Sequence, residues 1–309
     1  MENGSHSAVT EFVLQGSSQV LGLQLFLCVL LLLFYIIILP GNICIIVTIQ
    51  NNPSLKSPMF FFLANLALLD IFYSCVTPPK LIFNIFSGCR TISYLGCITQ
   101  IFFIHFLGGA EMFLLIAMAI DRYVAICHPL HYATVVSRVT CWAMVIASWI
   151  GGFIHSIIQV ILIIPLPFCG PNKLDNFFCD ITQIIRLACT NTYILEYVMF
   201  VSSGLVSTAC FILLLISYGT LLVKVRMGSS IGKNKAYSTC ITHIIIIFIM
   251  FGPAIYIYCH PFQDYPFDKV VAFFHTMIFP LLNPMIYTLR NKEIKVAMWR
   301  LFKNIKCRH

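Results

Sequence analysis

The sequence predicts an all-α membrane protein: a seven-transmembrane-helix bundle followed by a short amphipathic C-terminal helix. Of its 309 residues, 60% are hydrophobic and 10% are charged, whereas soluble domains carry roughly 25% charged residues. The apolar residues form blocks long enough for a helix of ~20 residues to cross a hydrocarbon layer of ~30 Å. The seven blocks run approximately over residues 23–49, 58–79, 97–121, 139–163, 194–223, 236–259 and 270–289. Each block is too long for a barrel strand, so helices are expected.

The blocks divide the chain into three regions. Residues 1–22 form a mostly polar tail, residues 23–289 the seven-transmembrane domain, and residues 290–309 an amphipathic helix and tail. The first tail contains no Lys or Arg, and the first apolar block is long enough to remain in the membrane as an anchor. We therefore expect no cleavable signal peptide and no second folded domain.

Charge asymmetry predicts the orientation. Loops on the side of the C-terminus hold 14 Lys and Arg residues against 2 acids, and the opposite side holds 5 against 7. Because Lys and Arg gather in cytoplasmic loops, we expect a multi-pass plasma-membrane protein with an extracellular N-terminus and a cytoplasmic C-terminus. The net charge of +8 then reflects an anionic inner leaflet and does not indicate nucleic acid as a partner. Asn3 begins a glycosylation tripeptide on the outer tail.

The last segment predicts a helix that lies on the inner leaflet. Its apolar residues recur at the spacing of one helix face: Ile294, Ala297, Met298, Leu301 and Phe302. Its cations lie largely outside that stripe: Lys292, Lys295, Arg300 and Lys303. Cys307, beside this helix, is a candidate for palmitoylation.

Four of the 14 cysteines are expected to form disulfides on the oxidising outer side. Cys97 opens the third helix, and the others lie in the long loop between helices four and five: Cys169, Cys179 and Cys189. Four cysteines permit three connectivities, which the residue pattern leaves open. A bridge to the third helix would make this loop a lid over the bundle. Cys89 is left over and is expected to be a free thiol.

Two acids lie well inside helices, where ionisable groups are costly and are functional candidates. We expect Asp70 and Glu111 to form a polar cluster with Asn42 and Asn283, able to hold water or a sodium ion. The alternative is that these side chains simply hydrogen-bond neighbouring helices. No other cofactor or metal is expected.

A ligand pocket is expected between the outer halves of the helices. Candidate side chains share one face of the third and sixth helices or lie on the fifth and seventh: Ile101, Ile104, His105, Gly108; Phe251, Ala254, Ile255, Tyr258; Ser202, Ser203, Val206; Thr276. The alternative for each residue is ordinary helix packing. Together they predict an apolar pocket with a few hydrogen-bonding groups, suited to a small, mostly apolar ligand.

The absence of two kinds of charged residue from the expected pocket narrows the class of ligand. The outer half of the third helix carries no acid that could anchor a cationic amine. The seventh helix has Lys269 only at its outer end, so a retinal Schiff base is not expected. His105 could hydrogen-bond an oxygen-bearing ligand.

Short motifs end the third and seventh helices. Asp121-Arg122-Tyr123 resembles the signalling motif of rhodopsin-like G-protein-coupled receptors, and Asn283-Pro284-Met285-Ile286-Tyr287 resembles their Asn-Pro-x-x-Tyr motif. Longer stretches resemble the olfactory (odorant) receptor family: Leu55 to Asp70, Met118 to Cys127, Lys235 to His243 and Tyr287 to Glu293. Departures are small, and one is Lys56, which stands where that family usually has His.

The resemblance implies an odorant receptor. A small volatile odorant would bind in the bundle, activate a stimulatory, olfactory-type heterotrimeric G protein and raise cAMP. Arg122 would pair with Asp121 and with polar groups of the sixth helix at rest, and would face the G protein after that helix moves outward. The resemblance also implies the pairs Cys97–Cys179 and Cys169–Cys189. It assigns coupling to these residues: Asp121, Arg122, Tyr123, Lys235, Asn283, Pro284 and Tyr287.

Other functions remain as alternatives. A rhodopsin-like receptor for a non-odorant small molecule differs in ligand, not in sequence pattern. A transporter would favour internal repeats and interrupted helices, which are not visible. An enzyme is not expected, because no metalloprotease helix motif, paired catalytic carboxylates or nucleophile elbow is present.

Overall fold

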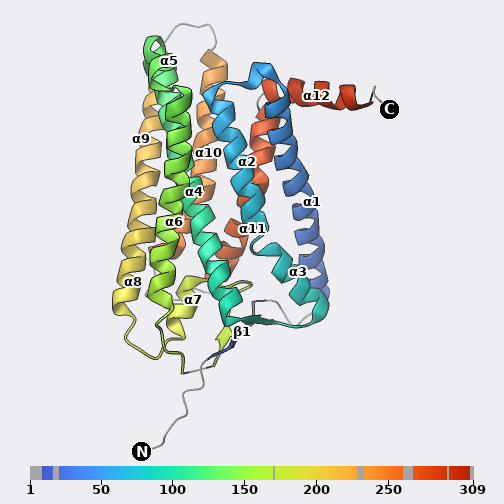
Figure 1. Cartoon of the computed structure of the whole chain (residues 1–309), viewed down its shortest axis with the longest axis vertical. Coiled ribbons are helices and arrows are strands. Elements are labelled where there is room, and N and C mark those ends of the chain that lie inside the picture. The colour runs from blue at the N-terminus through green and yellow to red at the C-terminus, as the bar shows by residue number, and fades with distance from the viewer. Residues whose placement is uncertain are drawn as a thin grey trace, which may run out of the picture.

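A bundle of long helices runs the length of the computed structural model (Figure 1). The structure describes residues 9–16, 21–169, 171–227, 233–259, 267–290 and 292–306. Asn3 and Cys307 lie outside the described residues, as do the side chains of Lys235, Asn283, Pro284 and Tyr287. The predictions made for these residues therefore remain predictions.

The helices of the bundle, in chain order, are α1 (Leu21–Asn51), α2 (Pro58–Ser74), α3 (Pro78–Ser87), α4 (Tyr94–Cys127), α6 (Arg138–Ile163), α8 (Tyr193–Met199), the π-helical segment η3 (Phe200–Leu205), α9 (Val206–Met227), α10 (Lys233–Tyr258) and α11 (Asp268–Arg290). Short elements lie in the connections: η1 (Pro53–Leu55), η2 (Pro129–His131), α5 (Tyr132–Val135) and α7 (Ile181–Arg186). The last helix, α12 (Lys292–Lys306), projects sideways from the bundle (Figure 1).

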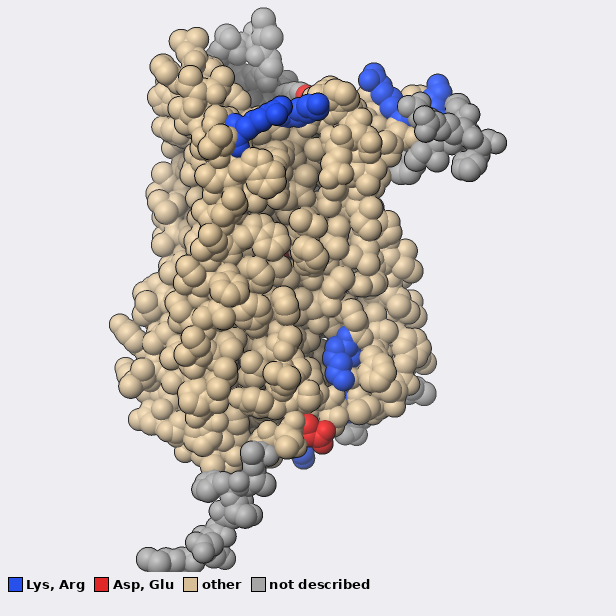
Figure 2. Space-filling model, in the orientation of Figure 1, with Lys and Arg blue, Asp and Glu red and all other residues tan. Residues whose placement is uncertain are grey.

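Within the described residues, six helical spans are long and apolar enough to cross a membrane. They cover 24–51, 58–87, 94–127, 138–163, 193–227 and 240–258. The 23-residue α11 packs against α1, α2 and α10 and completes the predicted bundle as its seventh helix. On the face shown in Figure 2, uncharged side chains cover the middle, and cations gather mainly at the end where α5 and α12 lie.

The second span is longer than its apolar block and is interrupted. Helix α2 ends at Ser74, and α3 continues the span from Pro78 to Ser87. Pro78 and Pro79 lack backbone N–H groups, and a proline disfavours helical geometry at the preceding residue. The break therefore falls just before them, inside the block that the sequence predicts as one helix.

A small sheet at the end opposite α12 is absent from the sequence prediction (Figure 1). Strand β1 (Glu11–Leu14) lies between β2 (Thr91–Ser93), to which it is antiparallel, and β3 (Lys173–Leu174), to which it is parallel. Phe12 and Leu14 of β1 are buried in an apolar cluster with α4 and the long loop before α8. Strand β1 is thus paired with the loop between α6 and α8, which forms the lid over the bundle.

Candidate functional site

A cavity of about 80 Å³ lies in the half of the bundle next to this sheet. Nine of the twelve predicted ligand-site residues line it: Ile104, His105, Gly108, Ser202, Ser203, Val206, Ala254, Tyr258 and Thr276. They come from α4, η3, α9, α10 and α11, so elements distant in sequence converge on one space. Its size suits a small molecule.

The remaining three predicted residues do not line this cavity. Ile101 packs in the apolar cluster around the Cys97–Cys179 bridge. Phe251 is fully buried in the main core, and Ile255 packs against that core. A helix face spans more than 100°, so residues at the predicted spacing can face either the cavity or a neighbouring helix.

The wall formed by η3 depends on contacts between helices. Gln159 of α6 donates hydrogen bonds from Nε2 to the hydroxyls of Ser202, at 2.7 Å, and Ser203, at 3.3 Å. A side chain at Gly204 would meet the carbonyl oxygen of Tyr258 at 2.7 Å, so glycine lets α10 approach η3 closely. Local π-helical turns inside helices are frequent at functional sites, and here the turn presents two serines.

Several polar residues of the cavity were not predicted. The His105 ring lies 5.7 Å, between ring centroids, from both His155 of α6 and Tyr258 of α10. The full set of unpredicted lining residues is Tyr73, Gly109, Met112, Phe113, His155, Phe178, Asp180, Ser207, Cys210, Ile257, Ala272 and His275. The cavity is therefore more polar than the predicted helix faces indicate.

Asp180 supplies an acid that the third helix lacks. It lies in the lid, directly after Cys179, and its carboxylate accepts a hydrogen bond from the Thr182 hydroxyl at 2.6 Å. Burial raises the pKa of this carboxyl above its ordinary value. Because Asp180 follows Cys179, which is bridged to Cys97 of α4, its sequence position could have been used to predict that it lies over the bundle.

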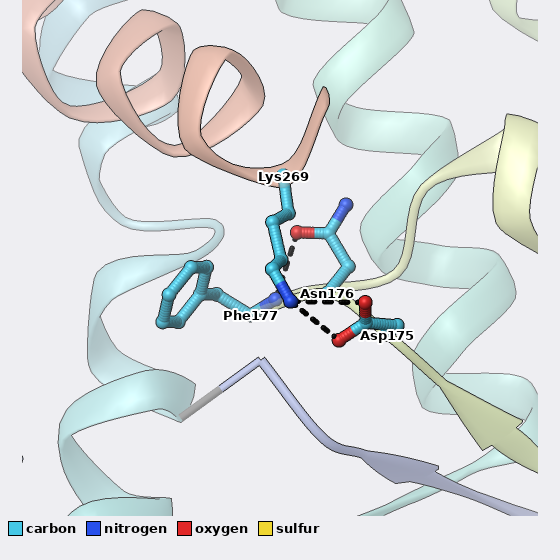
Figure 3. Close-up of polar contacts among 4 residues, drawn as sticks. All are labelled: Asp175, Asn176, Phe177 and Lys269. Atoms are coloured by element: carbon cyan, nitrogen blue, oxygen red, sulfur yellow. Dashed lines mark hydrogen bonds and ion pairs between the residues drawn. The ribbon is translucent and has the colours of Figure 1, made fainter. Parts of the chain in front are cut away.

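Several contacts hold the lid in place. The structure contains both disulfides that the family resemblance implies: Cys97–Cys179 ties the lid to α4, and Cys169–Cys189 joins the two ends of the lid to each other. The β1 strand pairs with β3 of the lid. Lys269, at the start of α11, forms an ion pair with Asp175 of the lid, with Nζ 2.9 Å from Oδ2 (Figure 3).

The lid also packs against α11 through an aromatic pair. The rings of Phe177 and Phe273 lie 4.9 Å apart between centroids. The Phe177 amide donates to the side-chain oxygen of Asn176 at 2.7 Å, which fixes the backbone beside Asp175 (Figure 3). Cys89, in contrast, is a free and exposed cysteine.

Midway along the bundle, Asn42, Asp70 and Glu111 are all buried. The carboxyl groups of Asp70 and Glu111 are close enough to interact electrostatically. Asn42 donates from Nδ2 to the Ile38 carbonyl at 3.1 Å. The Asn42 Oδ1 and Glu111 Oε1 atoms have no hydrogen-bond partner in the described part of the chain. These side chains provide oxygen donors for a cation or water, although no group of three acids, His or Cys suited to a metal occurs among the described residues.

Arg122 lies at the other end of α4. Its Nε atom is 3.8 Å from Oδ2 of the buried Asp121, and the Tyr132 hydroxyl donates to Oδ1 of the same acid at 2.7 Å. Burial raises the pKa of the Tyr132 phenol, which keeps it a hydrogen-bond donor. His243 of α10 stacks on Tyr218 of α9 near Arg122. The Lys224 ammonium lies over the ring of Tyr123, the third residue of the motif.

The sequence profile of the olfactory receptor family matches residues 31–305. The chain belongs to the olfactory receptor family. It is 58% identical to human olfactory receptor 4N5 over 97% of this chain and 98% of that protein. It is 59% identical to human olfactory receptor 4M1 over 99% of each, and 58% identical to mouse olfactory receptor 4M1 over 97% of each.

As an odorant receptor, this protein couples odorant binding to a G protein and a rise in cAMP. The family also confirms the predicted seven-helix membrane fold. One continuous 34-residue helix, α4, carries His105 and Gly108 at the cavity and Arg122 at the far end of the bundle. At 1.5 Å per residue, Gly108 and Arg122 are about 21 Å apart along the axis of the receptor.

Proposed function

We propose that the cavity beneath the lid is the odorant-binding site and that the N-terminus faces the exterior. The observation that carries the proposal is the convergence of α4, η3, α10 and α11 on one cavity roofed by a bridged loop. Its walls are mainly apolar, with hydroxyl, imidazole and carboxyl groups at defined places. Such a site favours a small volatile molecule with one or two hydrogen-bonding groups.

Ligand binding changes the packing of α10, which lines the cavity through Ala254 and Tyr258 and whose inner half packs near Arg122 through His243. A ligand shifts an equilibrium only if it binds one packing more tightly than the other. We infer that the odorant favours the arrangement in which α10 moves away from Arg122. The guanidinium then faces a stimulatory G protein at the cytoplasmic end, where cations gather.

The test is to fill the cavity without disturbing the surrounding helices. A volatile library is first screened in cells that express the receptor and an olfactory-type stimulatory G protein, with cAMP as the readout. Gly108→Val should then abolish or strongly weaken the responses. Among the described residues outside its own helix turn, an added Cβ meets only Tyr73 Cε2, at 3.8 Å, so the side chain is tolerated and occupies the cavity.

Gly219→Val is the matched control. An added Cβ at Gly219 of α9 meets no other described residue within 4 Å, so the responses of this variant should equal those of the native receptor. Full odorant potency in the Gly108→Val receptor, at equal surface level, would place the binding site elsewhere.

The polar cluster fits a sodium ion, and we infer that Asp70 and Glu111 hold one at rest. The support is the pair of carboxyl groups beside Asn42, with two buried oxygen atoms that lack partners among the described residues. A cation satisfies both oxygens and offsets the buried negative charge. Basal cAMP signalling should therefore fall as sodium replaces potassium, and Asp70→Asn should remove this dependence. A sodium effect that persists in Asp70→Asn would contradict the assignment.

A further inference from the structure

A large open groove lies far from the odorant cavity, between α1, α2, α5 and α6. Its volume is about 890 Å³, roughly ten times that of the cavity beneath the lid. It is at the end of the bundle where cations gather in Figure 2. The proposed odorant site does not use it, and it is linked to the Arg122 region through Tyr132, which lines the groove and donates to Asp121.

The floor of the groove is apolar and faces outward from the bundle. Phe61 of α2 packs against Trp142 of α6, with ring centroids 4.9 Å apart. Trp142 is 56% exposed, and Leu68 further along α2 is 36% exposed. In a membrane protein, side chains at this position contact acyl chains. The groove therefore has the shape and polarity to hold an extended hydrocarbon chain.

The rim of the groove is cationic. Lys56 precedes α2, and Arg138 begins α6, so the two charges come from different segments and meet at one opening. None of the described residues that line the groove is acidic, and neither cation has an ion pair with another described residue. The N-terminus of α2 also points here, and Ser57 makes no side-chain cap to it. Helix N-termini favour anions.

We propose that this groove is a specific site for an anionic glycerophospholipid of the inner leaflet. An acyl chain lies along Phe61 and Trp142, and the phosphate binds between Lys56 and Arg138. Basic openings between helices on the cytoplasmic side suit anionic headgroups, which are concentrated in that leaflet. A zwitterionic lipid or a sterol would leave two adjacent cations without a partner. The site rests on the orientation proposed above.

Lys56 lies at the mouth of the groove. A lysine there supplies a positive charge to an anionic headgroup, whereas an uncharged side chain of similar length would not. The other charged or titratable side chains that line it are Arg138, Tyr132 and Cys141.

The experiment uses the full-length receptor in detergent, titrated with phosphatidylglycerol that carries brominated acyl chains. Bromine quenches nearby tryptophan, and Trp142 is one of three tryptophans in the chain. We expect saturable quenching that is lost in Trp142→Phe. Lys56→Gln and Arg138→Gln should each weaken binding about fivefold, and the double variant about 25-fold, at about 1 kcal/mol per charge. Lys295→Gln/Arg300→Gln on α12 is the matched control and should leave quenching of Trp142 unchanged.

A second variant separates charge from shape. Lys56→His should bind the lipid more weakly at about pH 7.5 and regain affinity at about pH 5.5, because protonation restores the charge. The native receptor, which lacks this histidine, should bind equally at both pH values. A purely structural role for Lys56 would not produce this gain in pH dependence.

Three results would overturn the proposal. They are equal quenching by brominated phosphatidylcholine, displacement of the probe by cholesterol at lower concentration than by unbrominated phosphatidylglycerol, and unchanged affinity in a folded Lys56→Gln/Arg138→Gln receptor. None of these measurements uses an odorant or cAMP. A failure here is therefore distinguishable from a failure of the proposed odorant site.

Discussion

The two ends of the bundle are held together by different kinds of contact. At the end with the lid, the Cys97–Cys179 disulfide ties the lid to α4, and Cys169–Cys189 joins the two ends of the lid to each other. A three-stranded sheet and the Lys269–Asp175 ion pair connect the lid to strand β1 and to α11. At the other end, the described contacts around Arg122 are non-covalent: an ion pair with Asp121, the Tyr132 hydrogen bond and the stacked rings of Tyr218 and His243.

This difference indicates where movement takes place. A covalently fixed lid limits how far the cavity can widen around a bound ligand. Contacts between side chains at the opposite end can exchange partners at low cost, because packed interfaces switch between discrete arrangements. We therefore expect the end with the lid to determine which ligand binds and the end with Arg122 to change shape.

The largest expected effect is the loss of signalling when Arg122 is replaced. Arg122→Ala should abolish odorant-evoked cAMP, because among the described residues Arg122 supplies the planar guanidinium that pairs with Asp121. The surface level, measured with an antibody to an N-terminal epitope, should not change. Arg300→Ala, on the exposed face of α12, is the control and should respond normally. A fully active Arg122→Ala receptor would contradict the assignment of signalling to the end of the bundle that contains Arg122.

The next effect tests the covalent roof. The Cys97–Cys179 bridge closes a separation of 82 residues, and Cys169–Cys189 closes 20. In the chain-entropy model these closures correspond to about 4.5 and about 3 kcal/mol of stability. Cys97→Ser/Cys179→Ser should lower the melting temperature of the purified receptor, followed by tryptophan fluorescence, more than Cys169→Ser/Cys189→Ser. It should also abolish odorant responses, since the lid loses its anchor on α4. Equal losses in both variants would contradict a special role for the first bridge.

Much of the fold could be predicted because the membrane imposes a simple rule on the sequence. Blocks of apolar residues indicate the spans. The number of blocks predicts the number of helices, and the charge asymmetry of the loops predicts which end faces the cytoplasm. The break before Pro78 was missed because hydropathy continues through it. The strand Glu11–Leu14 was missed because its partners, at residues 91–93 and 173–174, are distant in sequence.

The residues that line the cavity could be predicted only where their position on one helix face is enough to place them there. His105 and Gly108 share a face of α4, and both line the cavity. Ile101 has the same spacing and is buried in a neighbouring cluster, because the packing of adjacent helices decides which part of a face stays open. Asp180 and His155 come from a loop and from α6, whose positions depend on a disulfide and on close contacts between α4 and α6. Periodicity within one helix carries no information about either.

The smallest expected effect concerns the ion pair between the lid and α11. The Lys269 and Asp175 side chains are 37% and 62% exposed, so water and salt screen their attraction and the pair contributes less than about 1 kcal/mol. Lys269→Ala should shift the melting temperature only slightly, and the shift should shrink at high salt. Lys173→Ala, an exposed lysine on the same lid, is the control. Because the bridge to α4 and the Phe177–Phe273 contact remain, odorant potency should stay close to native. A loss as large as that of the Cys97→Ser/Cys179→Ser receptor would mean that electrostatic contacts, not the disulfide, hold the roof in place.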